Sequence, residues 1–104
     1  MLNINNLRNL CYDKCIAVSK HAQIRLSERS ITVDDIKTAI CNGEIIRHYE
    51  DDLPFPSCLV LGLAESNNHI HVVASIDNDY LHIITAYYPD INVWEADFKT
   101  KRKV

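Results

Sequence analysis

The chain has 104 residues, a formal net charge of −3 and an apolar fraction of 47%. This length is typical of one domain with a modest core, so we expect a single domain over residues 1–104. The negative charge argues against binding nucleic acid through bulk positive charge, and any basic site must be local. No apolar run is long enough to cross a bilayer and no signal peptide precedes the chain, which predicts a cytoplasmic protein without a membrane partner.

The four cysteines, Cys11, Cys15, Cys41 and Cys58, are predicted to be reduced thiols. Cys11 and Cys15 followed by His21 provide three possible ligands for a metal, but their spacing matches no strong zinc pattern. We therefore expect buried free thiols, no metal and no other cofactor.

Helical spacing of apolar residues marks the N-terminal part of the chain. Ile4, Leu7 and Leu10 predict a first helix of roughly a dozen residues. After an apolar stretch at 15–18, interpreted as an extended link, Ser19 caps a helix from Lys20 to about residue 30.

A third helix follows the second. Thr32 is its predicted cap, the acidic pair at 34–35 suits its positive end, and Gly43 is expected to end it in the left-handed conformation.

After Gly43 the hydrophobic period changes to that of strands. Strands are expected at residues 44–50, 57–64, 69–76 and 80–88, with a last helical turn or edge piece at 94–98. Short links favour an antiparallel meander. The predicted fold is α+β, with N-terminal helices packed on one face of a four-stranded antiparallel sheet.

A candidate phosphate site lies on the second predicted helix. His21, Arg25 and Arg29 follow each other at intervals of four residues and form one stripe. Imidazole moves protons near neutral pH, and guanidinium binds phosphate oxygens in a planar fork. The alternative is that the arginines form surface ion pairs, as Arg25 can with Glu28, and that His21 is a partly buried helix-start residue.

The last predicted strand adds polar groups. Strict alternation places Leu81, Ile83, Thr85 and Tyr87 on one face, which we expect to meet the helices. The Tyr87 hydroxyl is then a candidate proton donor near a phosphate, and the alternative is a core-edge aromatic with its hydroxyl in water.

Three histidines, His69, His71 and His82, fall on neighbouring predicted strands. They could form a metal triad, but no carboxylate pattern supports a second shell, and a solvent-exposed sheet face also collects histidines. We favour the second interpretation.

Several motifs resemble one small prokaryotic family over about residues 16–100. The matching segments are Ser19-Lys20-His21-Ala22, Arg25, Glu28-Arg29-Ser30-Ile31, Gly43-Glu44-Ile45-Ile46, Tyr49, Pro54-x-Pro56-Ser57-Cys58-Leu59, His71-Val72-Val73, Ile84-Thr85-Ala86-Tyr87-x-Pro89-Asp90 and Trp94. The family is domain of unknown function 4258, and it is similar to RelE-like toxins and other metal-independent ribonucleases. The family usually has glycine where this chain has Ser30, which makes a left-handed helix end costlier.

The resemblance implies a ribonuclease toxin. It implies RNA as substrate, including mRNA on the ribosome, and a small zinc-finger antitoxin as partner. His21, Arg25, Arg29 and Tyr87 are the predicted catalytic residues, and Lys20 and Thr85 are predicted to bind substrate. The alternative function is a non-catalytic protein-binding module that uses the sheet or the loop at 53–56.

Overall fold

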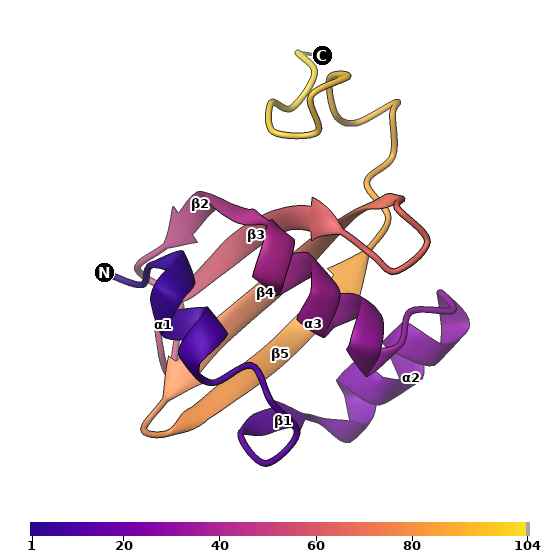
Figure 1. Ribbon diagram of the computed structural model, residues 1–104. Helices are drawn as coiled ribbons and strands as arrows, with labels where there is room; N and C mark the ends of the chain where they lie inside the picture. The colour runs from indigo at the N-terminus through magenta and orange to yellow at the C-terminus, as the bar shows by residue number, and fades with distance from the viewer. Residues whose placement is uncertain (104) are drawn as a thin grey trace.

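The computed structural model describes residues 1–103, and its elements form an α+β fold in which three helices lie on a five-stranded sheet (Figure 1). In chain order the elements are α1 (Ile4–Asn9), β1 (Ile16–Val18), α2 (Lys20–Glu28), α3 (Val33–Asn42), β2 (Glu44–Tyr49), β3 (Ser57–Leu63), β4 (His69–Asp77) and β5 (Tyr80–Tyr87). The first helix is therefore shorter than its apolar spacing predicted. No helix within residues 1–103 is long and apolar enough to cross a bilayer.

The sheet has the strand order β1-β5-β4-β3-β2. The strands from β2 to β5 form the expected antiparallel meander. The prediction of four antiparallel strands was nevertheless wrong, because β1 pairs in parallel with β5 and makes the sheet five-stranded and mixed. A three-residue strand is too short to show alternation, and its partner lies far along the chain.

The second helix begins and ends as its sequence predicts. The Ser19 hydroxyl accepts a hydrogen bond of 3.1 Å from the backbone N–H of Ala22. At the other end Ser30 has a φ of 57°, in the left-handed region. The N–H of Ile31 reaches the carbonyl of Leu26 at 2.9 Å, which completes a Schellman ending with Ser30 at the position that glycine usually holds.

Helix α3 is capped at its start and ends at Gly43, but Gly43 is extended, with a φ of −98°, so the left-handed ending expected there was wrong. Thr32 and Asp35 cap its start reciprocally, with bonds of 3.0 Å each way between side chain and backbone. Further along, the backbone of α3 approaches β3 so closely that a Cβ on Gly62 would lie 2.2 Å from the carbonyl oxygen of Ala39. Glycine at position 62 is therefore required for the packing of this helix on the sheet.

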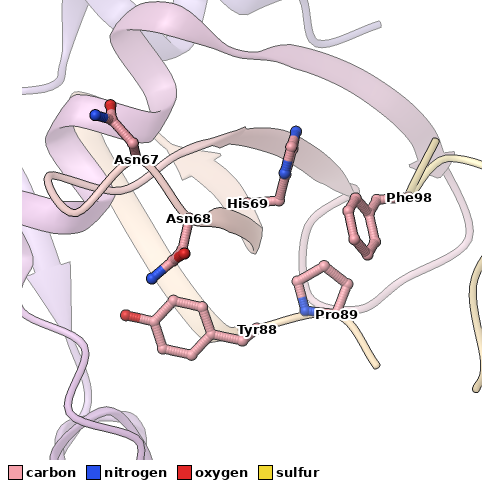
Figure 2. Close-up of a pocket in the computed structure, with 6 residues that line it drawn as sticks. All are labelled: Asn67, Asn68, His69, Tyr88, Pro89 and Phe98. Atoms are coloured by element: carbon pink, nitrogen blue, oxygen red, sulfur yellow. The ribbon is translucent and has the colours of Figure 1, made fainter. Parts of the chain in front are cut away.

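The segment after β5 folds back against β4. Trp94 is only 4% exposed, and it forms an isolated bridge with Lys101 in place of the helical turn that was one expectation for 94–98. The Phe98 ring lies beside the His69 ring, with centroids 4.8 Å apart (Figure 2). This C-terminal segment, residues 88–103, thus covers part of the sheet.

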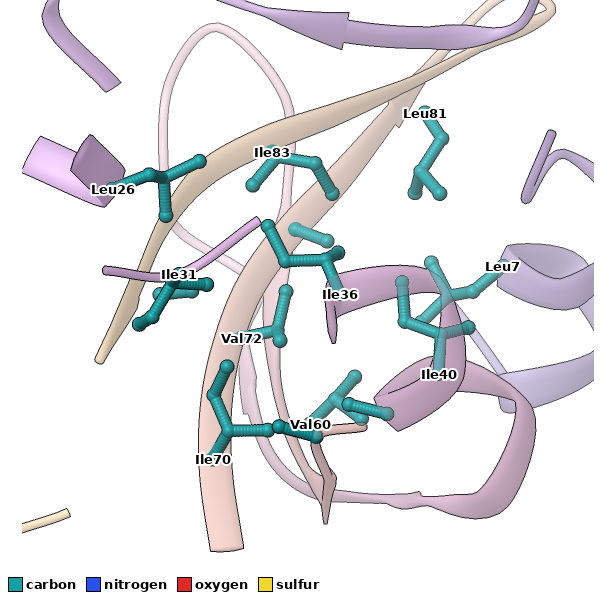
Figure 3. Close-up of a cluster of buried hydrophobic side chains, with 14 of the residues drawn as sticks. Leu7, Leu26, Ile31, Ile36, Ile40, Val60, Ile70, Val72, Leu81 and Ile83 are labelled. Carbon is teal, nitrogen blue, oxygen red and sulfur yellow. The ribbon is translucent and has the colours of Figure 1, made fainter. Parts of the chain in front are cut away.

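The main hydrophobic core lies between the sheet and the helices (Figure 3). Its largest members are Leu7, Leu26, Ile31, Ile36, Ile40, Val60, Ile70, Val72, Leu81 and Ile83. All three helices therefore pack on one face of the sheet (Figure 1). We call the opposite face of the sheet the helix-free face. It carries the side chains that alternate with the core residues of each strand.

Candidate functional site

The predicted stripe on α2 is divided by the way the helix packs. Ala22 and Leu26 are buried, and α2 contacts β5. His21 and Arg25, together with Lys20, point outward and are exposed. Within residues 1–103 none of these three side chains forms a hydrogen bond or an ion pair, so the structure leaves them free to meet a ligand from solvent.

Arg29 has a different environment, at the C-terminal cap of α2. Its Nη1 donates to the Thr85 hydroxyl and to the carbonyl oxygen of Ala86, each at 3.0 Å. Strand β1 ends at Val18, opposite Ile83, so the outer edge of β5 is open where Arg29 reaches it. Arg29 and Thr85 are thus brought together, whereas His21 and Arg25 do not contact them.

A bulge in β5 decides where Thr85 and Tyr87 point. Ala74 pairs with Ile83 and Val73 pairs with Thr85, so one extra residue, Ile84, interrupts the alternation. Beyond the bulge Ala86 joins the core, and Thr85 and Tyr87 turn to the helix-free face. The expectation that Thr85 and Tyr87 lie on the core face was therefore wrong, because strict alternation does not survive a bulge. Thr85 still contacts the end of α2, through Arg29 at the open edge of β5.

On the helix-free face Tyr87 meets a buried histidine. His71, directly opposite on β4, is 0% exposed, and its Nδ1 lies 3.3 Å from the Tyr87 hydroxyl. Its Nε2 lies 2.8 Å from the carbonyl oxygen of Phe98. A carbonyl only accepts, so Nε2 carries the proton of a neutral imidazole and Nδ1 accepts from Tyr87. The three groups form a hydrogen-bonded chain from Tyr87 through His71 to Phe98.

The two titratable side chains in this series of hydrogen bonds, Tyr87 and His71, are both held neutral. Burial lowers the pKa of His71 below its usual 6.5; the bond to Phe98 opposes that shift, and the positive charge of Arg47 adds to it. Burial raises the pKa of Tyr87, and so does neighbouring Tyr49, whereas the guanidinium groups of Arg29 and Arg47 lower it. At neutral pH the pair is a phenol that donates to an unprotonated imidazole nitrogen.

Aromatic and cationic neighbours surround the pair. The Trp94 ring meets the His71 ring edge-on, with centroids 4.5 Å apart. The Arg47 guanidinium carbon lies 5.5 Å from the centroid of Trp94. The prediction from sequence missed Arg47 as a site residue and considered His71 only as a metal ligand. The available signal was that Tyr49 and His71 belong to the family motifs, but their contact depends on the sheet register.

The three strand histidines do not converge. His71 is held by Tyr87 and Phe98, and His82 lies at the other end of the sheet, where its Nε2 is 3.6 Å from an Asp77 oxygen. Within residues 1–103 no group of three or more His, Cys, Asp or Glu side chains is placed to hold a metal ion. The four cysteines are free, but the expectation that they are buried holds only for Cys58, since Cys11 and Cys15 are partly exposed and Cys41 is exposed. Burial raises the pKa of both Cys11 and Cys58 to about 11.

The chain matches one protein family, described as domain of unknown function (DUF4258), over residues 18–88. No curated protein and no solved structure gives a significant match. The matched range contains α2, the meander and the residues Arg29, His71 and Tyr87, and it stops before Trp94 and Phe98. Because the match covers well over half of the sequence, the chain belongs to the DUF4258 family.

Proposed function

We propose that the chain is a RelE-like, metal-independent ribonuclease in which Tyr87 and His71 transfer the proton and Arg29 binds the scissile phosphate. The observation that carries the proposal is the hydrogen bond from the Tyr87 hydroxyl to Nδ1 of the buried, neutral His71. Two guanidinium groups lie close enough to Tyr87 to lower its pKa against the effect of burial. A proton donor and acceptor beside paired cations suit phosphodiester cleavage.

The proposed reaction needs no metal. The ribose 2′-oxygen bonds to phosphorus, and the bond from phosphorus to the 5′-oxygen breaks. As the 2′-hydroxyl proton passes to the Tyr87 oxygen, the phenolic proton moves to Nδ1 of His71. The imidazolium keeps its Nε2–H bond to Phe98 and then returns its proton through Tyr87 to the leaving 5′-oxygen. Tyr87 and His71 end in their starting protonation states.

Charge develops on the phosphate during this reaction and calls for fixed cations. The Nη1 group of Arg29 is anchored on Thr85 and Ala86, and within residues 1–103 its Nε and Nη2 donate to no other group. An anchored guanidinium with free N–H groups stabilises a pentavalent phosphate without having to reorganise. In this proposal Thr85 acts by holding Arg29.

The exposed part of α2 then binds neighbouring phosphates. His21 lies eight residues before Arg29, a distance of about 12 Å along the helix at 1.5 Å per residue. That distance favours a binding role for His21, shared with Lys20 and Arg25, over the catalytic role, as base or acid, expected from sequence. Substituting His21 or Arg25 with Ala should raise KM and change kcat little.

The test is cleavage of single-stranded RNA by the purified chain in EDTA, with and without translating ribosomes. Tyr87→Phe removes one oxygen and should slow cleavage by roughly 10²–10⁴-fold. Tyr80→Phe, an exposed tyrosine at the start of the same strand, should leave the rate unchanged. A 2′-deoxy nucleotide at the cut site should block cleavage. Parental activity of Tyr87→Phe, or cutting at the 2′-deoxy site, would refute the mechanism.

A second candidate function is protein binding, favoured by one loop. Between β2 and β3, Leu53 is 90% exposed and Phe55 is 38% exposed. Large exposed apolar side chains mark contact surfaces for another protein. If the chain is a toxin, the same loop would contact its small zinc-finger antitoxin. Induced expression separates the functions: a ribonuclease arrests growth and Tyr87→Phe relieves the arrest, whereas a binding module does neither.

A further inference from the structure

A cavity lies at the end of the helix-free face, where β4 begins and β5 ends. Its volume is about 370 Å³, within the range of small-molecule pockets. Six residues line it: Asn67, Asn68, His69, Tyr88, Pro89 and Phe98 (Figure 2). They come from the turn before β4, the start of β4 and the segment after β5, so the cavity exists only in the folded chain.

Flat rings form the walls of this cavity. The rings of His69 and Phe98 lie with centroids 4.8 Å apart at an angle of 36°, and Tyr88 bounds the other side. In Figure 2 the rings of Tyr88, Pro89 and Phe98 surround one hollow. Tyr88 is 40% exposed although it is aromatic, so its face is available to a ligand. Aromatic faces at such openings are what unstacked nucleobases pack against.

Amide groups supply the polar edge. Asn67 and Asn68 both line the cavity, and Asn67 is held in the left-handed region with a φ of 67°. One N–H of Asn68 Nδ2 donates to the Ser66 hydroxyl at 3.1 Å, which orients the amide and leaves its carbonyl oxygen and its other N–H unused by Ser66. An oriented amide with a donor and an acceptor suits the hydrogen-bonding edge of a base.

The lining of this cavity does not repel a phosphate-bearing ligand. This cavity has no carboxylate in its lining. Two other cavities do: one is lined by Glu44 and Asp97, and another by Asp52 and Asp77. Carboxylates repel phosphate, so a nucleotide is better accommodated between Asn68, Tyr88 and Phe98 than in either of those two.

The cavity also adjoins the proposed cleavage site. Phe98 contributes its ring to the wall and its carbonyl oxygen to His71, and Tyr88 follows Tyr87 directly. A base held here would place the phosphate of the same nucleotide toward Tyr87. We propose that this cavity binds an unpaired nucleobase of single-stranded RNA next to the cut; the RNA part of this proposal rests on the proposed function above.

The first test measures binding alone. The full chain is titrated with the four nucleoside 3′-monophosphates and with ribose 5-phosphate, and amide shifts are followed by NMR. Nucleotides should shift the side-chain amides of Asn67 and Asn68, and ribose phosphate should not. Tyr88→Leu and Asn68→Ala should each weaken binding at least tenfold. The matched controls Tyr80→Leu and Asn5→Ala, at exposed positions far from the cavity in the fold, should not.

Equal shifts with ribose phosphate, or unchanged nucleotide binding in Tyr88→Leu and Asn68→Ala, would overturn the proposal. The second test keeps it apart from the cleavage proposal by mapping cut positions in a mixed-sequence RNA. The same two variants should change which base flanks the cut. Nucleotide binding without any cleavage would support the nucleobase-binding cavity and refute the proposed ribonuclease activity. Cleavage with the same cut positions in both variants would refute the nucleobase-binding cavity and support the proposed ribonuclease activity.

Discussion

At the scale of single residues, the proposed chemistry depends on one imidazole, that of His71. His71 is fully buried, and its two ring nitrogens face a hydroxyl and a carbonyl. The carbonyl fixes the tautomer, and the tautomer decides that Tyr87 donates. The same burial that makes His71 a weak base makes its imidazolium a ready proton donor, which the proposed return of the proton requires.

The lowered pKa of His71 predicts a pH dependence of stability. Above its unfolded pKa of 6.5, His71 is neutral in both states and contributes no pH dependence. As the pH falls below that value, the unfolded chain takes up the proton first, so the free energy of unfolding decreases until the folded pKa is passed. Urea unfolding between about pH 7.5 and pH 5 should show this loss.

The control for that experiment is a second histidine. His71→Gln should flatten the pH dependence, whereas His21→Gln, at an exposed position on α2, should keep it. An unchanged slope in His71→Gln would show that other groups cause the acid loss.

At the scale of elements, one carboxylate connects a helix to the sheet. Asp35 is 9% exposed; one of its oxygens accepts from the N–H of Thr32 at 3.0 Å, and the other accepts from the N–H of Glu65 at 3.1 Å. The first bond caps α3, and the second fixes the turn between β3 and β4 against it. That turn contains Asn67 and Asn68, so α3 helps to place the cavity walls.

Asp35 and its neighbour Asp34 form a matched pair for measuring this connection. Asp35→Ala removes a cap and leaves two partly buried N–H groups, those of Thr32 and Glu65, without their acceptor, so the free energy of unfolding should fall by about 2 kcal/mol. Asp34→Ala, at an exposed position in the same helical turn, should change it by less than about 0.5 kcal/mol. Equal losses in urea unfolding would mean that the charge near the helix start matters and the two hydrogen bonds do not.

At the scale of the whole molecule, the C-terminal segment completes the helix-free face. Trp94 is buried against His71 and lies near the cations Arg47 and Lys101, whose charged groups are 5.5 and 5.6 Å from its ring centroid. The segment lies beyond the range matched by the family, yet it supplies Phe98 both to the hydrogen bonds of His71 and to the cavity. The candidate site is thus built from segments far apart in the sequence, with Arg29 from the N-terminal third and Phe98 from the C-terminal segment.

Trp94→Ala should therefore act on stability and on the site together. Truncating a buried tryptophan costs about 3 kcal/mol, and the loss of its contact should expose His71 to water. We expect a lower melting temperature and, by NMR titration, a His71 pKa closer to its usual value. Trp94→Phe, which keeps a ring against His71, should retain most of the parental melting temperature and most of the lowering of the His71 pKa. A variant that melts earlier with an unchanged His71 titration would show that the segment does not shield the imidazole.

Local signals in the sequence determined most of the elements and the family. Ser19 and Thr32 are informative because caps act within a few residues, and Gly43 marks the end of its helix although its backbone is extended. The left-handed helix end at Ser30 was suggested by the family resemblance, since the family usually has glycine there. The strands of the meander follow from alternation and short links. The motifs that resemble DUF4258 led to the family that the chain belongs to.

Tertiary structure alone decided which of the candidate residues meet. The parallel pairing of β1 and the bulge at Ile84 depend on contacts between distant segments, and no local pattern encodes them. A one-residue slip in a strand moves every later side chain to the other face. Tyr87 therefore contacts His71 on the helix-free face and does not face α2. Residue types are set by the sequence, whereas faces and partners are set by register.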